Sequence, residues 1–300
     1  MNELKFKPLK AALFMALAVF LFSCMDVLTK HMAESFPAPF VVAARYAGNL
    51  VLLLALVAPR EGKRIVHLGR PWLVILRGAC LSAVSLTAAL AFQRMPVAET
   101  IAVVFLAPFA VTLLAGPLLG EKVQPISWIA AAGGFVGVLM IVRPGSGLDP
   151  LGVLYAGLTA GGSIVYNMLS RSLARTETSW SMMFWTALVG TVIFSSVTLG
   201  QGAIPVPQGM DLVFLGAMGA LSLVGHLLFT QAFRYAPAST ISPVNYLQLV
   251  WSGILGLLVF GHMPDPWALA GMALIAVSGV SGALYPLIQP RFARKIGGLA

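Results

Sequence analysis

Apolar residues run through this chain in long, nearly unbroken stretches separated by short polar segments. Each stretch approaches the roughly 20 helical residues that cross a hydrocarbon core about 30 Å thick. The runs are continuous and do not alternate with period two, so they predict helices rather than the strands of a membrane barrel. We place ten spans at residues 10–30, 38–58, 71–92, 97–118, 125–143, 150–173, 179–200, 210–233, 239–261 and 265–287. The predicted fold class is an all-α membrane protein with ten transmembrane helices.

Composition supports this prediction. The 300 residues are 59% hydrophobic and 10% charged, and the mean hydropathy is +0.91. An ordinary soluble domain carries roughly a quarter charged residues, so a water-soluble fold is excluded. The spans leave no room for a soluble domain between them.

The net charge of +9 is not a nucleic-acid signal, because its basic residues gather on one side of the predicted membrane. Fourteen of the 19 lie in segments on the side of the N-terminus, three lie on the other side, and Arg45 and Arg77 lie in or at the edge of spans. The positive-inside rule therefore places both termini in the cytoplasm, which requires an even number of spans. The predicted location is a bacterial-type inner (cytoplasmic) membrane. The fourteen are Lys5, Lys7, Lys10, Arg60, Lys63, Arg64, Arg70, Lys122, Arg171, Arg175, Arg234, Arg291, Arg294 and Lys295; the three are Lys30, Arg94 and Arg143.

A weak internal repeat appears when the sequence is shifted by 141 residues. Eight identities then fall between residues 91 and 125, and the fourth span stays in register with the ninth. Duplication explains this pattern, although chance similarity between apolar segments remains an alternative. Each half, 1–145 and 146–300, then holds five spans, and an odd number inverts the second copy relative to the first. Inverted repeats suit alternating access to a site near the midplane.

Several short motifs are spread along both halves of the chain. They are Ser23-x-x-Asp26-x-x-x-Lys30, Arg45, Arg77-Gly78, Ala91-Phe92, Pro96, Pro108, Gly120-Glu121, Ala232-Phe233, Pro237, Pro243 and Gly261. In their order and spacing they resemble the ten-helix, EamA-type metabolite exporters of the drug/metabolite transporter superfamily. The resemblance covers nearly the whole chain and implies two inverted five-helix repeats and export of amino acids or similar metabolites without ATP. The sequence departs from the family pattern at His262, which follows Gly261 where the family usually carries Glu.

Two ionisable residues stand out inside the predicted spans, where such groups are costly and must face protein or water. Asp26 can bind a substrate ammonium, relay a proton, or pair with Lys30 or a neighbouring helix. Arg45, with Asn49 one turn later on the same face, can clamp a substrate carboxylate or pair with Asp26 or Glu34. We interpret Arg77 as a snorkelling anchor and Glu99 as a charge favoured by its helix N-terminus.

Neutral polar residues gather in the second half. Each can serve simply in helix-to-helix hydrogen bonding, but together they predict a wet cavity. Phe105 corresponds to Tyr246 in the repeat, so the two rings are expected to face each other, as an apolar wall of the site or as ordinary packing. The candidate substrate-binding set is Asp26, Arg45, Asn49, Phe105, Tyr166, Asn167, His226, Asn245, Tyr246 and Gln248.

Pro108 and Pro243 each remove a backbone donor and predict kinks that serve as hinges. Glycines at small-xxx-small spacing predict close helix contacts. These glycines are the pairs Gly116/Gly120, Gly133/Gly137 and Gly157/Gly161.

The sequence contains no ATP-binding loop, no hydrolase motif, and no histidine or cysteine spacing typical of a metal site. We therefore expect no catalytic residues, no cofactor and no metal. The partners expected are a small-molecule substrate and the lipid bilayer; the oligomeric state is left open, a monomer included. The predicted function is a secondary transporter, a broad-specificity amino-acid exporter working by alternating access. The alternatives are a carrier of a vitamin, a nucleoside-like metabolite or a quaternary amine, and a membrane-embedded enzyme.

Overall fold

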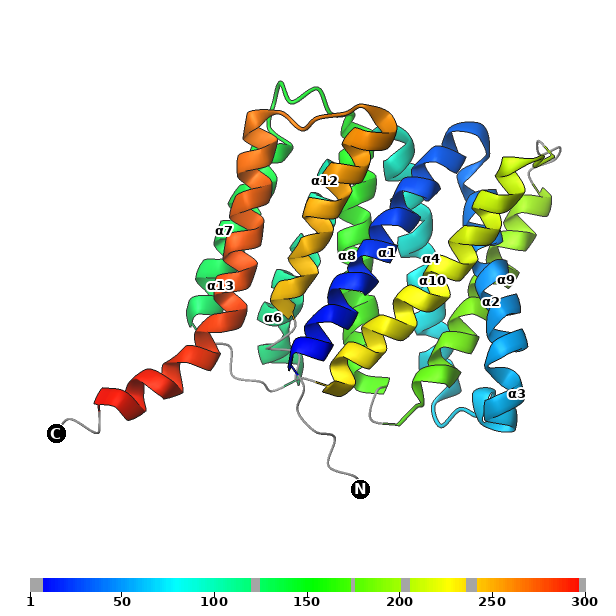
Figure 1. Cartoon of the computed structure of the whole chain (residues 1–300), viewed down its shortest axis with the longest axis horizontal. Coiled ribbons are helices and arrows are strands. Elements are labelled where there is room, and N and C mark those ends of the chain that lie inside the picture. The colour runs from blue at the N-terminus through cyan, green and yellow to red at the C-terminus, as the bar shows by residue number, and fades with distance from the viewer. Residues whose placement is uncertain (1–7, 120–124, 174–175, 201–205, 236–241, 297–300) are drawn as a thin grey trace.

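The computed structural model describes residues 8–119, 125–173, 176–200, 206–235 and 242–296, and within these ranges its regular structure is entirely helical (Figure 1). Every predicted span corresponds to helix. The elements are α1 (Pro8–Ser35), α2 (Ala38–Leu56), α3 (Ala58–Glu61), η1 (Gly62–Ile65), α4 (Pro71–Arg94), α5 (Val97–Val104), α6 (Leu106–Leu119), α7 (Pro125–Ile141), α8 (Pro150–Leu173), α9 (Ser179–Gly200), α10 (Met210–Tyr235), η2 (Ser242–Tyr246), α12 (Leu247–Phe260) and α13 (Pro266–Ile296).

Prolines and glycines set several helix boundaries. Proline is the first residue of α4, α7, α8 and α13, where its missing N–H costs nothing and its fixed φ suits the first turn. Met95, just after α4, is extended at φ −130° and ψ 155° because Pro96 follows it. Gly261 ends α12 in the left-handed conformation at φ 67°, which glycine adopts without steric cost.

The fourth predicted span is interrupted, and the described part of the ninth changes from a 3-10 helix to an α-helix at the corresponding position. Phe105 separates α5 from α6, and Tyr246 ends η2 just before α12. A shift of 141 residues carries Leu106, where α6 begins, onto Leu247, where α12 begins. Pro108 accounts for the first break, because a proline cannot bond to the carbonyl four residues earlier, which belongs to Val104.

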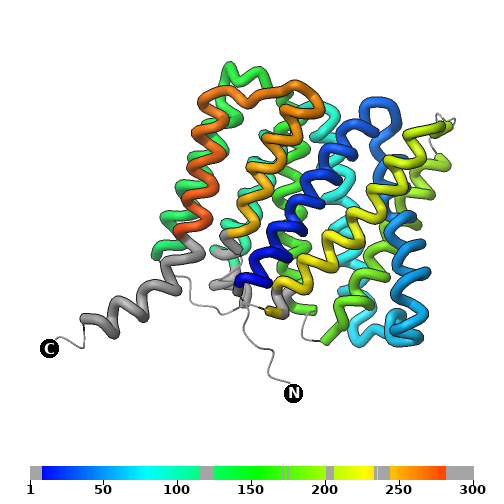
Figure 2. The backbone as a smooth tube through the Cα atoms, viewed as in Figure 1, coloured from blue at the N-terminus to red at the C-terminus, as the bar shows by residue number. Residues whose placement is uncertain are grey.

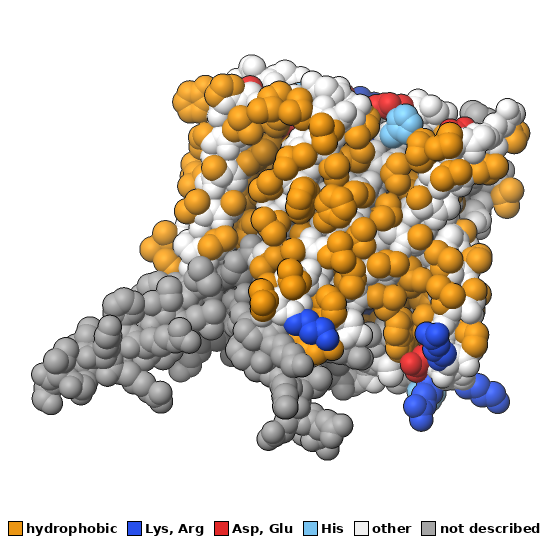
Figure 3. Space-filling model, in the orientation of Figure 1, with side chains coloured by type: hydrophobic (Ala, Val, Ile, Leu, Met, Phe, Trp, Pro, Cys, Tyr) orange, Lys and Arg blue, Asp and Glu red, His pale blue; other side chains and the backbone are white. Residues whose placement is uncertain are grey.

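On the face seen in Figure 3, the described surface is apolar over most of its height, and charged side chains gather near its upper and lower rims. Within the described ranges, five helices are long and apolar enough to cross a membrane: α1, α2, α4, α9 and α10. Further apolar helical stretches are shorter, at Val97–Val111, Pro125–Ile141, Val244–Phe260 and Pro266–Ser281. Large side chains such as Leu13, Phe135 and Leu258 are exposed on the outside of the bundle, as expected for a lipid-facing surface.

The helices pack in four main pairs: α1 with α10, α4 with α8, α2 with α9, and α7 with α13 (Figures 1 and 2). Gly137 and Gly271 allow α7 and α13 to approach closely. A Cβ added at Gly271 would lie 2.5 Å from the carbonyl oxygen of Gly137. The prediction of close helix contact at Gly157 and Gly161 was wrong, since nothing lies within 4 Å of a Cβ built at either position.

Some predicted features fall outside the described residues. They include Gly120, Glu121, Lys122 and Pro237, together with the first part of the ninth predicted span.

Candidate functional site

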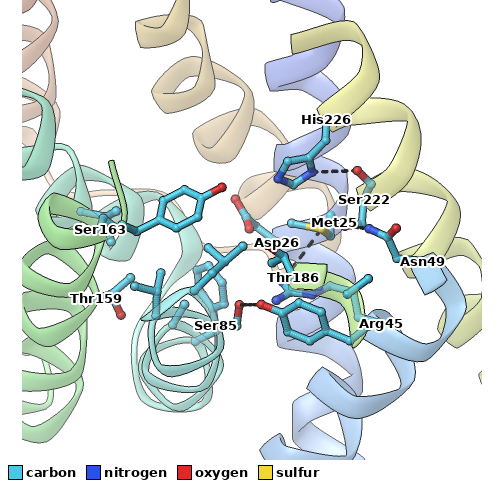
Figure 4. Close-up of a pocket in the computed structure, with 18 of the residues that line it drawn as sticks. Met25, Asp26, Arg45, Asn49, Ser85, Thr159, Ser163, Thr186, Ser222 and His226 are labelled. Atoms are coloured by element: carbon cyan, nitrogen blue, oxygen red, sulfur yellow. Dashed lines mark hydrogen bonds between the residues drawn. The ribbon is translucent and has the colours of Figure 1, made fainter. Parts of the chain in front are cut away.

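A cavity of about 230 Å³ lies inside the bundle, among helices from both halves of the chain. Six of the ten predicted site residues line it. Figure 4 shows Asp26 near the centre, with Ser163 and Thr159 of α8 on one side and Arg45, Asn49 and His226 on the other. The six are Asp26, Arg45, Asn49, Tyr166, His226 and Gln248.

Asp26 lies in the second half of α1 and is 9% exposed. Its Oδ2 accepts a hydrogen bond from Nε2 of Gln248 at 3.1 Å, which joins α1 to α12. The alternative that Asp26 pairs with Lys30 is wrong, because Lys30 Nζ donates to the carbonyl oxygens of Phe92 at 2.6 Å and Met95 at 3.0 Å. Among the described ion pairs Asp26 has no basic partner, so its carboxylate remains open to a ligand.

Arg45 projects from α2 into the same cavity. Its guanidinium lies over the ring of Tyr46 at 5.1 Å, and its Nη1 approaches the sulfur of Met25 at 4.0 Å, a weak acceptor. Neither Asp26 nor Glu34 forms an ion pair with it in the part of the chain that the structure describes. A guanidinium with five donors and so little protein bonding is suited to bind an anionic group of a ligand.

Arg77 is not the interfacial anchor that we expected from its position. It is 8% exposed and lines the cavity. Nε donates to Ser170 Oγ at 2.7 Å, Nη1 to Thr186 Oγ1 at 2.8 Å, and Nη2 to the hydroxyl of Tyr166 at 2.6 Å. The guanidinium also lies 4.5 Å from the centre of the Tyr166 ring. The side-chain acceptors that hold Arg77 are all neutral, so no carboxylate is hydrogen-bonded to its guanidinium in the described residues. Its positive charge therefore contributes to the electrostatics of the cavity.

Asn49 and His226 complete the wall formed by α2 and α10. Asn49 donates from Nδ2 to Ser222 Oγ at 2.9 Å, while its Oδ1 is buried without a partner. The ring of His226 packs edge-on against Phe22 with centroids 5.0 Å apart. Its Nδ1 lies 2.8 Å from the carbonyl oxygen of Ser222, which can only accept, so Nδ1 carries the proton in this contact.

Small hydroxyl residues in the wall were not predicted from the sequence. Tyr46 and Ser85 share a hydrogen bond of 2.8 Å at the cavity surface, and Thr186 also lines it. Isolated serines and threonines are common in membrane helices, where they bond to their own backbone, so nothing in the sequence distinguishes these from the rest.

Four predicted site residues lie away from the cavity lining. Phe105 and Tyr246 face each other as expected, with centroids 5.2 Å apart, but both belong to the hydrophobic core. Asn167 is exposed and bonds to the carbonyl oxygen of Ser163 at 2.7 Å. Asn245 is partly buried and its Oδ1 has no partner.

The cavity thus combines a single carboxylate, Asp26, with the two guanidinium groups of Arg45 and Arg77. Amide, imidazole and hydroxyl groups surround them, together with apolar side chains such as Leu81 and Val84. This arrangement can hold a small molecule that carries both an ammonium and an acidic group. The described residues include no group of three or more metal-ligating side chains.

Comparison with known protein families gives a match over both halves of the chain. The model of the EamA-like transporter family matches residues 9–143 and again residues 150–282.

Individual relatives extend over most of the chain. A riboflavin transporter of Rhizobium johnstonii is 30% identical, over 88% of this chain and 87% of its own length. The pseudopaline exporter of Pseudomonas aeruginosa is 28% identical, over 91% of this chain and 96% of its own. An S-adenosylmethionine uptake transporter of Rickettsia felis is 26% identical, over 84% and 85%. These relatives are named for different substrates and for opposite directions of transport.

Proposed function

The chain belongs to the EamA-like transporter family, and on that basis we propose that it is a secondary transporter that exports amino acids with broad specificity by alternating access. It is a multi-pass membrane protein of a family of small-molecule transporters. The observation that carries the proposal is the cavity into which Asp26 and Arg45 both project, although neither forms an ion pair in the described part of the chain.

The proposed architecture is ten spans in two inverted repeats, 1–145 and 146–300. The packing of the helices supports it. In this arrangement α1 corresponds to α8, α2 to α9 and α4 to α10. Replacing each helix by its counterpart in the other half turns the α1–α10 contact into the α8–α4 contact, and both contacts are present. The same exchange maps the α2–α9 and α7–α13 pairs onto themselves. The matching breaks at Phe105 and Tyr246 fit the same relation.

We place both termini in the cytoplasm of a cell whose inner membrane holds the protein. The start of α1 lies at the lower end of the bundle, as do α3 and η1, which carry Arg60, Lys63 and Arg64 (Figure 1). Basic residues gather on the cytoplasmic side of membrane proteins, so this end is assigned to the cytoplasm.

The mechanism follows from a site shared by two bundles. Rocking of the halves would expose the cavity to each side in turn, and the breaks near Pro108 and Pro243 are the proposed hinges. Asp26 would contact the ammonium of the substrate and Arg45 its carboxylate, while the positive charge of Arg77 favours an acidic group. The apolar part of the wall would accept varied side chains. Without an ATP-binding motif, the energy must come from a solute or ion gradient.

A screen in proteoliposomes tests this function. Purified protein is reconstituted into liposomes loaded with one labelled amino acid at a time, and efflux is compared with that of empty liposomes. The proposal predicts efflux of several amino acids that Asp26→Asn and Arg45→Ala both reduce. Absence of flux for every amino acid, under any gradient, would refute it.

A vitamin or nucleoside-like substrate is the second candidate, favoured by the 30% identity to a riboflavin transporter. The same proteoliposomes loaded with riboflavin distinguish the two. Efflux of riboflavin without efflux of amino acids would assign the cavity to this second class.

A further inference from the structure

A second cavity, of about 280 Å³, lies at the end of the bundle opposite the basic loops. Residues from both halves of the chain surround it, with the turn between α4 and α5 on one side and the end of α12 on the other. The polar groups in its lining include Lys30 of α1, Gln93 of α4 and His262, which follows α12. We call it the outer cavity, and the cavity around Asp26 the central cavity.

Glu99 is buried beside the outer cavity. It lies in the first turn of α5 and is 3% exposed. One oxygen, Oε1, lies 2.8 Å from Nε2 of His262, while the other, Oε2, is buried without a hydrogen-bond partner among the residues that the structure describes. The side chain of His262 is 40% exposed, so the pair connects a buried carboxyl group to an accessible imidazole.

The position of Glu99 places it between the two cavities. Its neighbour Ala98 lines the outer cavity, and its other neighbour Thr100 lines the central one. Helix α1 also reaches both cavities, because Asp26 lines the central cavity and Lys30, one turn later, lines the outer cavity. Glu99 therefore lies between a residue that lines the outer cavity and one that lines the central cavity.

Other charged groups at this end already have partners. Lys30 donates to two backbone carbonyl groups and interacts electrostatically with Glu99. The other titratable and charged groups described on the elements that pack against α5 include Asp26 of α1, bonded to Gln248, and His31 and Glu34 of α1, which pair with each other. They also include Arg77 of α4, bonded to Tyr166 of α8, and Tyr155 of α8. Arg94 of α4 pairs with Asp149 before α8, and Arg143 after α7 pairs with Asp265 before α13.

We propose that the Glu99–His262 pair is a proton-binding site that couples transport to proton movement. The inference rests on the proposed transport function. When Glu99 is ionised, the Nε2–H of His262 donates to Oε1. A proton that enters from the outer cavity adds to a carboxylate oxygen, with Oε2 free to receive it, and the negative charge of Glu99 is lost. No other bond has to break, because a neutral carboxyl group can still accept at Oε1.

The pair also joins the two halves of the protein. Glu99 belongs to α5 in the first half, and His262 follows α12 in the second. A carboxylate attracts an imidazole N–H more strongly than a neutral carboxyl group does, since hydrogen bonds to ionised groups are roughly twice as strong. Loss of the charge therefore weakens the outer contact between the halves, which links proton binding to opening on this side.

Infrared titration tests the site without any substrate. Protein in lipid is titrated across the pH range in which it stays folded, and the band of the protonated carboxyl group is followed. Glu99→Gln should remove one component of this band, and His262→Gln should move its midpoint. Glu34→Gln, which alters an exposed carboxylate on the same side, is the control and should leave that component unchanged. Identical titrations of Glu99→Gln and the wild type would overturn the proposal.

Flux measurements test the coupling. In proteoliposomes with labelled amino acids at equal concentration on both sides, a gradient of one pH unit can drive up to about tenfold accumulation on one side at one proton per substrate. Glu99→Gln should lose this gradient-driven accumulation while it keeps exchange of amino acids across the membrane. Wild-type flux that ignores the pH gradient would refute the coupling. Flux that is absent altogether would refute the transport function, while the infrared titration would still decide the proton site.

Discussion

Gln248 donates a hydrogen bond from Nε2 to Oδ2 of Asp26 at 3.1 Å, and this bond joins α12 of the second half to α1 of the first. Because Oδ2 is the acceptor, the bond requires an oxygen at this position but not a negative charge. The structural role and the proposed ligand role of Asp26 can therefore be separated by mutation.

Asp26→Asn keeps an acceptor for Gln248 and removes the charge. We expect its unfolding temperature in detergent to stay within a few degrees of the wild type, and its apparent affinity for substrate to fall by about tenfold, as for loss of one charged hydrogen bond. Gln248→Leu leaves the buried carboxylate unpaired and should destabilise the fold by about 1–3 kcal/mol. Equal destabilisation by both substitutions would contradict this division of roles.

Arg77→Ala tests whether the buried guanidinium holds α4 against α8 and α9. The substitution removes the donors to Ser170, Thr186 and Tyr166 and leaves a void, so we expect a loss of about 2–4 kcal/mol. Arg94→Ala is the matched control, since it breaks a partly exposed ion pair worth about 0–1 kcal/mol. Thermal unfolding of the purified variants measures both. Equal losses would show that Arg77 is an ordinary surface residue.

Gly271→Ala should weaken the contact between α7 and α13. The new methyl group would meet the carbonyl oxygen of Gly137, a backbone atom that cannot rotate away, so we expect a cost of about 1–3 kcal/mol. Gly157→Ala places the same methyl group in open space on α8 and should instead stabilise the helix by up to about 1 kcal/mol. Opposite shifts in unfolding temperature are the expected result, and shifts of the same sign would contradict the observed packing.

The hydrogen bonds of Asp149 lead us to expect that the folded state loses some of its stability in acid. The hydrogen bond from Arg94, followed by that from the amide of Leu151, holds the pKa of Asp149 below its ordinary value of 3.8. Its ionised form therefore stabilises the folded state above that value, and the contribution is lost as the pH falls through the lower folded pKa.

The measurement is the difference in unfolding temperature between the wild type and Asp149→Asn as a function of pH. The difference should be constant at neutral pH, begin to shrink as the pH approaches the ordinary value of 3.8, and vanish only below the lowered pKa of the folded state, where both proteins carry a neutral side chain. A difference that persists into strong acid would show that the charge of Asp149 does not contribute.

The helices were predictable from the sequence because long apolar runs have few alternatives in a membrane. Even the break near Pro108 followed from a local rule, the missing N–H of proline. Asp26, Arg45 and Asn49 line one cavity, in keeping with the rule that an ionisable group in hydrocarbon must face protein or water, and their role in binding stays a prediction.

The contacts between distant helices were not predictable. Arg77 lies near a helix end, where a snorkelling side chain and a buried one have the same sequence pattern, and only Tyr166 and Thr186 distinguish them. Glu99 was expected at a helix N-terminus, and α5 places it there, but its partner His262 lies 163 residues away. Periodicity within a span carries no information about such pairs.

Arg45 provides the most direct test of the claim that the central cavity binds the transported solute. The measurement is the initial rate of efflux from proteoliposomes as a function of internal substrate concentration, for the wild type, Arg45→Ala and Arg45→Lys. Loss of a charged hydrogen bond of about 1.5–3 kcal/mol should raise the apparent KM of Arg45→Ala by about 10- to 150-fold, and lysine should restore part of it. Arg60→Ala, outside the cavity, should leave KM unchanged. An unchanged KM in Arg45→Ala would contradict the claim.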